Sequence, residues 1–104
     1  LDITLRDLLP VNKDTGGYRG LKRSYINWQR FLLFCERYSI DGEVYRKMIA
    51  AALADLLHYE NRLMERGEPE GEFNCSLAEL LSFMEIVGLN PADLPASLRN
   101  CCLG

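Results

Sequence analysis

The chain of 104 residues is long enough for one domain with a hydrophobic core that needs neither a disulfide nor a metal ion. Hydrophobic residues make up 48% and charged residues 26%, which excludes a disordered segment, and no apolar run approaches the roughly 18 residues that cross a bilayer. The formal net charge is −3, whereas domains that bind nucleic acid are commonly basic.

The N-terminal third predicts a short apolar element, a polar loop and a long helix. Ile3–Leu9 is apolar and is followed by Pro10, so we interpret it as a helical turn or as a short extended edge strand. Residues 11–20 are polar and glycine-rich, which favours a loop. Apolar residues then recur every three or four positions over Leu21–Tyr38, which predicts a helix. Its expected buried stripe consists of Leu21, Tyr25, Trp28, Leu32 and Cys35, widened by Phe31, Phe34 and Tyr38.

The middle of the chain predicts a second long helix over Glu43–Arg66. Asp41-Gly42 before it favours a turn and an N-cap. The helix is apolar on two sides, a pattern typical of a central bundle helix, and an oligomer contact is the alternative. The expected main stripe is Tyr45, Ile49, Ala52, Leu56, Tyr59 and Leu63, and a weaker second row is Leu53, Leu57 and Met64.

The C-terminal third begins with an acidic loop over residues 67–74. Ser76 and Glu79 are spaced as a capping box, so we expect a third long helix from there to Val87, ended by Gly88. Asn90 and Pro91 then favour a short further helix. The whole pattern predicts a single all-α bundle of four to five helices over residues 1–104, with a short N-terminal extended segment as a variant. The expected core residues of the third helix are Leu77, Leu80, Leu81, Met84 and Val87.

Three arginines, Arg23, Arg30 and Arg37, recur every seven residues in the first long helix. Seven residues make almost two turns, so the three side chains should form one row on the side opposite the buried stripe. Residues 1–47 hold nine Lys/Arg and six Asp/Glu (+3), whereas residues 48–104 hold three and nine (−6). A basic row on an acidic protein predicts a docking surface for an acidic partner. The expected partner-binding residues are Arg19, Lys22, Arg23, Ile26, Arg30, Leu33 and Arg37.

The sequence shows no pattern typical of a catalytic, metal or cofactor site. The only histidine, His58, falls on the polar side of its helix, away from any candidate nucleophile. The cysteines lack the closely spaced pairs of a zinc site. We therefore expect a non-enzymatic domain without a metal or cofactor. Carboxylates expected on exposed helix surface, without the apolar burial that tunes a catalytic acid, are Asp55, Glu60 and Glu65.

The four cysteines do not suggest a disulfide framework. Cys101 and Cys102 are adjacent, Cys35 lies within an apolar helix, and we expect no secretory leader. We therefore expect reduced thiols and a location in the cytoplasm or nucleus. The chain opens on Leu1 rather than Met, so we also expect it to be a domain cut from the C-terminal region of a longer protein.

The run Ile3-Thr4-Leu5-Arg6-Asp7-Leu8-Leu9, a loop with Gly16-Gly17 and Arg19, and a helix rich in basic and aromatic residues resemble the start of the C-terminal domain of rhabdovirus phosphoproteins. The resemblance covers residues 3–38 and implies a helical domain that attaches the viral polymerase cofactor to nucleoprotein–RNA. It assigns the nucleoprotein contacts to Arg19, Lys22, Arg23 and Arg30. The same helix also resembles the core-binding domains of tyrosine recombinases, which grip DNA.

These patterns favour a protein-interaction domain that binds an acidic protein surface. Direct binding of DNA or RNA is an alternative, because a row of arginines could neutralise phosphates. Against it, the sequence pI is about 5.1, and the aromatic residues of the first helix fall on its expected core side. An oligomerisation module built on the second helix is a further alternative.

Overall fold

The computed structural model describes residues 3–10, 20–67 and 73–103. These residues form the helices α1 (Leu5–Leu8), α2 (Leu21–Tyr38), α3 (Glu43–Glu65), α4 (Leu77–Ile86) and α5 (Ala96–Arg99), with a 3₁₀ helix, η1 (Pro91–Asp93), between the last two. The described part of the chain contains no strand, and one isolated bridge joins Ser76 to Leu103. The predicted all-α class is therefore confirmed.

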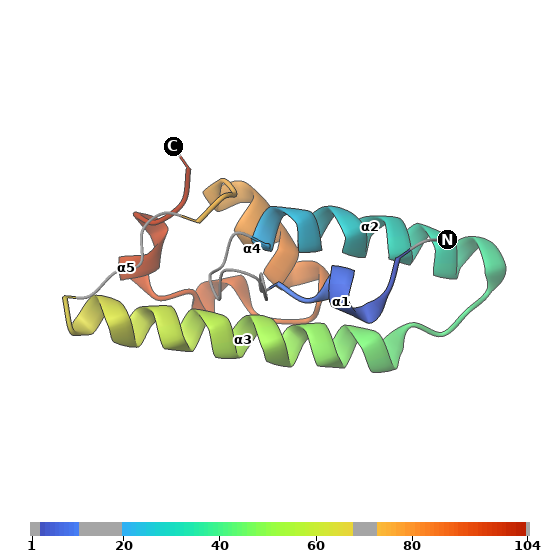
Figure 1. Cartoon of the computed structure of the whole chain (residues 1–104), viewed down its shortest axis with the longest axis horizontal. Coiled ribbons are helices and arrows are strands. Elements are labelled where there is room, and N and C mark those ends of the chain that lie inside the picture. Colours follow the sequence, from blue (N-terminus) through green and yellow to red (C-terminus); the bar gives the residue numbers. More distant parts are fainter. Residues whose placement is uncertain (1–2, 11–19, 68–72, 104) are drawn as a thin grey trace.

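The two long helices, α2 and α3, run in opposite directions along the long axis of the molecule (Figure 1). A short turn joins them at one end, and α4 and α5 lie towards the other end. Helix α1 packs on α2, α4 also packs on α2, and α5 packs on α3. Residues from all of these elements form one hydrophobic core, whose largest fully buried side chains include Trp28, Phe73 and Phe83.

Helix α1 replaces the extended segment that the sequence left open for Ile3–Leu9. The backbone amide and the hydroxyl of Thr4 both donate to Asp7 Oδ2 at 3.0 Å, which fixes the first turn. Two side chains of α2 then hold α1 in place. The buried hydroxyl of Ser24 donates to the carbonyl oxygen of Leu8, and Asn27 Nδ2 donates to the carbonyl oxygen of Asp7 at 3.1 Å.

Helix α2 has the predicted bounds, but its buried side is narrower than predicted. Leu21, Trp28 and Cys35 are buried as expected, whereas Leu32 and Tyr38 are exposed. Ser24 is buried although it is polar. The reason is that α1 packs on α2 and its Leu8 carbonyl gives the Ser24 hydroxyl an acceptor, so a polar residue takes part in the packing.

The buried side of helix α3 lies between the predicted main stripe and the weaker row, and Ile49 and Leu63 of the main stripe are buried as predicted. Tyr45 and Tyr59 are 42% and 50% exposed, whereas Leu53 and Leu57 of the weaker row are buried. Helix α5 packs on α3, and residues of α4 and the segment around η1 meet it near Leu57, so this side is covered. The prediction that Glu60 lies on exposed surface is also wrong, because this residue is only 4% exposed.

Helix α4 begins with the predicted capping box. Glu79 N donates to Ser76 Oγ at 3.1 Å, and Ser76 N donates to Glu79 Oε1 at 3.0 Å. This second hydrogen bond is the main reason why the pKa of Glu79 lies below its usual value. The helix is followed by Gly88 at φ +89°, a conformation that favours glycine. Phe83, which the sequence pattern missed, is fully buried, whereas Leu77 and Leu81 are half-buried.

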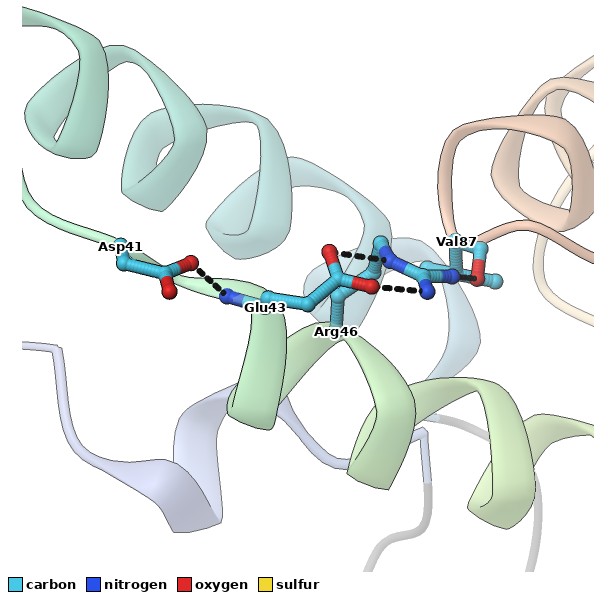
Figure 2. Close-up of polar contacts among 4 residues, drawn as sticks. All are labelled: Asp41, Glu43, Arg46 and Val87. Atoms are coloured by element: carbon cyan, nitrogen blue, oxygen red, sulfur yellow. Dashed lines mark hydrogen bonds and ion pairs between the residues drawn. The ribbon is translucent and has the colours of Figure 1, made fainter.

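Arg46 ties the start of α3 to the end of α4 (Figure 2). Its guanidinium donates to both carboxylate oxygens of Glu43, with Nε at 2.8 Å from Oε2, and it also donates to the carbonyl oxygen of Val87. The hydrogen bond from Arg46 lowers the pKa of Glu43. Asp41 Oδ1 accepts from Glu43 N at 2.9 Å, so the turn before α3 supplies a cap, although the N-cap residue itself is Gly42.

Candidate protein-interaction surface

A ridge of basic and apolar side chains runs along α2 on the side away from the core. Arg23, Arg30 and Arg37 are all exposed, while the buried residues of this helix gather on the opposite side. Within residues 3–10, 20–67 and 73–103, none of these three guanidinium groups forms a salt bridge. We call Arg23, Ile26, Arg30, Leu33 and Arg37 the basic ridge.

The apolar members of the basic ridge are unusually open to solvent. Ile26 is 44% exposed and Leu33 is 66% exposed. Single exposed apolar residues are common, but here two of them alternate with cations along one helix side. The ridge therefore offers apolar contact area and positive charge together.

Two ridge arginines also interact with their own chain without losing exposure. The guanidinium carbon of Arg37 lies 5.5 Å from the ring centroid of Tyr38, within the range of a cation–π contact. The pKa of Asp7 is lowered mainly by the hydrogen bonds from Thr4, and the charge of Arg23 contributes to this effect. Arg30 forms no hydrogen bond, salt bridge or ring contact within the described part of the chain.

Of the other two predicted site residues, Lys22 and Arg19, only Lys22 lies in the described part of the chain. Lys22 Nζ lies 3.9 Å from Glu79 Oε2, and Lys22 N donates to Asn74 Oδ1 at 3.2 Å, so this residue joins α2 to the start of α4. Such a half-exposed ion pair contributes little to stability. Arg19 lies outside the described residues, so the structure does not place it.

A second apolar surface, which the sequence pattern missed, surrounds the turn between α2 and α3. Ile40 in the turn and Val44 at the start of α3 are exposed, and the sequence gave no reason to expect this. Tyr38, Tyr45 and Met48 are also exposed there. The helical periodicity predicted that both tyrosines belong to core stripes. Spacing alone does not show where the elements that cover a stripe end, so it could not predict that these two residues are exposed.

A small pocket lies where α3, the end of α4 and the segment around η1 meet. Its volume is about 210 Å³, below the roughly 300–1,000 Å³ of typical small-molecule sites. His58, predicted on the polar side of its helix, is exposed and forms part of its wall. The sequence gave no indication of this pocket, because its wall comes from segments more than 20 residues apart. The complete lining is Ala54, Leu57, His58, Met84, Leu89, Asp93 and Pro95.

The cysteines are free in the structure, and Cys35, Cys75 and Cys101 are buried. Burial raises the pKa of Cys75 to about 12, and burial also raises the pKa of Cys35 and of Cys102. Such thiols are poor nucleophiles near neutral pH, because the thiolate is the reactive form. Among the described residues, no group of three or more His, Cys, Asp or Glu side chains is placed to hold a metal ion.

The described residues also contain no helix with both the length and the apolar character that a membrane span requires.

The chain belongs to a family described as a repeat of unknown function (DUF7826), whose model matches residues 1–89. Searches of curated proteins and of solved structures found no match.

Proposed function

We propose that this domain is a non-enzymatic protein-interaction domain that binds an acidic protein surface through the basic ridge of α2. The observation that carries the proposal is the exposure of Ile26 and Leu33 among three arginines that form no salt bridge within the described residues. A partner can therefore gain contacts here without first breaking internal ion pairs.

The ridge combines the two properties that protein recognition uses. Apolar side chains near the centre of a contact supply binding energy when water is excluded. Guanidinium groups around them select carboxylates and speed the encounter with an acidic surface. The aliphatic stems of arginines also cover apolar surface while the charged groups stay hydrated.

A more specific form of the proposal follows from the resemblance of residues 3–38 to rhabdovirus phosphoproteins. In that form the domain attaches a polymerase cofactor to nucleoprotein–RNA through Lys22, Arg23 and Arg30, together with Arg19. This form rests on the sequence pattern alone, because the family that matches has no known function.

The test is an affinity capture experiment with the domain as bait and mass spectrometry as the readout. The double variant Arg23→Glu/Arg30→Glu should lose the partner that the wild-type domain retains. The matched control is Lys47→Glu/Arg66→Glu, which makes the same change in charge at one exposed position of α3 and at its exposed C-cap residue, and it should retain the partner. All three proteins should show the same helical circular dichroism and melting temperature. Equal capture by both double variants would refute the proposal.

Nucleic-acid binding is the second candidate, favoured by the same guanidinium groups, which form no salt bridge within the described residues. It predicts binding of arbitrary oligonucleotides that weakens steeply as the salt concentration rises. A fluorescence anisotropy titration with a labelled single strand and a labelled duplex at low salt checks this. No change in anisotropy would exclude this candidate and leave an acidic protein as the partner.

A further inference from the structure

The ridge of α2 and the pocket beside α3 have complementary chemistry, and this points to the identity of the partner. Resting on the proposed function, we propose that the acidic surface is provided by a second copy of this domain. Leu33 of one copy enters the pocket of the next copy, and Arg30 pairs there with Asp93.

The inserting side of the contact is the most open apolar residue of the ridge. Leu33 is 66% exposed, and Arg30 and Arg37 lie one turn before and one turn after it on the same side of α2. A side chain that enters a pocket from this helix therefore brings at least one guanidinium to the pocket rim.

The receiving side is mostly apolar and carries one acid. Ala54, Leu57, Met84, Leu89 and Pro95 line the pocket, and its ionisable lining residues are His58 and Asp93. Asp93 is exposed and forms no salt bridge within the described part of the chain. The volume of about 210 Å³ is small for a drug-sized ligand, so a single apolar side chain is the better match.

The distribution of charge over the chain favours the same pairing. Residues 1–47, which include the ridge, have a net charge of +3. Residues 48–104, which include the pocket lining, have a net charge of −6. Contact between the ridge of one copy and the pocket of another therefore brings opposite charges together, whereas contact between two ridges brings like charges together.

The ridge and the pocket lie on different elements, and in a head-to-tail contact one copy uses its ridge and the next copy uses its pocket, so each pair keeps one free ridge and one free pocket. Contacts of this kind extend into rows of copies. This agrees with a family that is described as a repeat. Units that recur in one chain meet at a high effective concentration, so even a weak contact between ridge and pocket would form there.

The test uses two variants that each block one side. Leu33→Glu removes the inserting side chain, and Ala54→Arg places a bulky cation at an exposed helix position in the pocket wall. In sedimentation velocity, the wild-type average mass should rise with concentration beyond that of a dimer. Each variant alone should stay monomeric, and an equimolar mixture should form a dimer and nothing larger. Ala51→Arg, one turn away on α3 and not in the pocket wall, is the matched control and should associate like the wild type.

Two results would overturn the self-association proposal. One is a wild-type chain that remains monomeric at all concentrations, and the other is a mixture of the two variants that forms no dimer. If the wild type is monomeric but Arg23→Glu/Arg30→Glu still loses a captured acidic protein, the ridge binds a different partner and the proposed function stands. If all variants fold and neither association nor capture depends on the ridge, both proposals fail.

Discussion

The buried hydroxyl of Ser24 provides a sharp test of how α2 is oriented, and therefore of which side carries the ridge. Ser24 is fully buried and donates to the carbonyl oxygen of Leu8, a group near the end of α1. Ser24→Ala removes this donor and leaves a buried carbonyl without its side-chain partner. The substitution adds no bulk, so the rest of the packing should be unchanged.

The expected loss follows from the cost of an unpaired buried polar group. Leaving such a carbonyl unpaired costs about 1–3 kcal/mol, whereas the higher helix propensity of Ala returns roughly 0.5 kcal/mol. The net expectation is a loss of about 0.5–2.5 kcal/mol in the free energy of unfolding. For a domain of this size, that corresponds to a decrease in Tm of about 2–20 °C.

Urea unfolding followed by circular dichroism measures this change. Ser82→Ala is the matched control, because Ser82 is also helical but is only half-buried, and its side chain forms no hydrogen bond within the described residues. It gains the same propensity and loses no bond, so the two variants should differ by about 1–3 kcal/mol. Amide exchange in α1 should also accelerate in Ser24→Ala. Equal stability of the two variants would refute the assigned role of Ser24.

Three further predictions concern the end of α4, its beginning and the buried thiols. Gly88→Ala should destabilise the fold by more than about 1–2 kcal/mol, because Gly88 has φ +89° and an added Cβ would clash with Arg46 Nη1. The cost should fall in an Arg46→Ala background, as urea titrations can show. The pKa of Glu79 is lowered in the folded state, so its contribution to stability is present above its unfolded pKa and is lost as the pH falls. Glu79→Gln should therefore flatten the decline in stability between about pH 5 and 3, and an unchanged acid profile would contradict this. Burial raises the pKa of Cys75 to about 12, so iodoacetamide at pH 8 should modify the half-buried Cys102 before Cys75. Unfolding in urea should abolish this difference in alkylation rate, and peptide mass spectrometry would detect both results.

Local sequence features predicted the elements well. Periodicity gave the bounds of α2 at Leu21 and Tyr38, and the spacing of Ser76 and Glu79 located the start of α4. These features act within one or two turns of backbone, so they do not depend on what lies beyond the helix. The same reasoning placed the ridge arginines on one side of α2, and their exposure agrees with that placement.

Burial along α3 was predicted only in part, because helical spacing is local whereas burial depends on distant elements. The helix is apolar on two sides, and the predicted main stripe correctly included the buried Ile49 and Leu63. It also included the exposed Tyr45 and Tyr59, and it ranked the side of the buried Leu53 and Leu57 as the weaker one. Both sides fit helical spacing equally well, so periodicity could not choose between them. The choice is made by α5 and the segment around η1, which follow α3 by more than 20 residues.

The sequence by itself determined the helical class, the positions of the main helices and the row of three arginines, because helix propensity, capping and seven-residue spacing are local properties. The tertiary structure decided which side of α3 is buried, that Ser24 and Glu60 leave solvent, and that a pocket forms beside His58. Each of these depends on contacts between residues far apart in the chain. Long-range packing is not encoded in the spacing of any one segment, which is why only the folded molecule could show it.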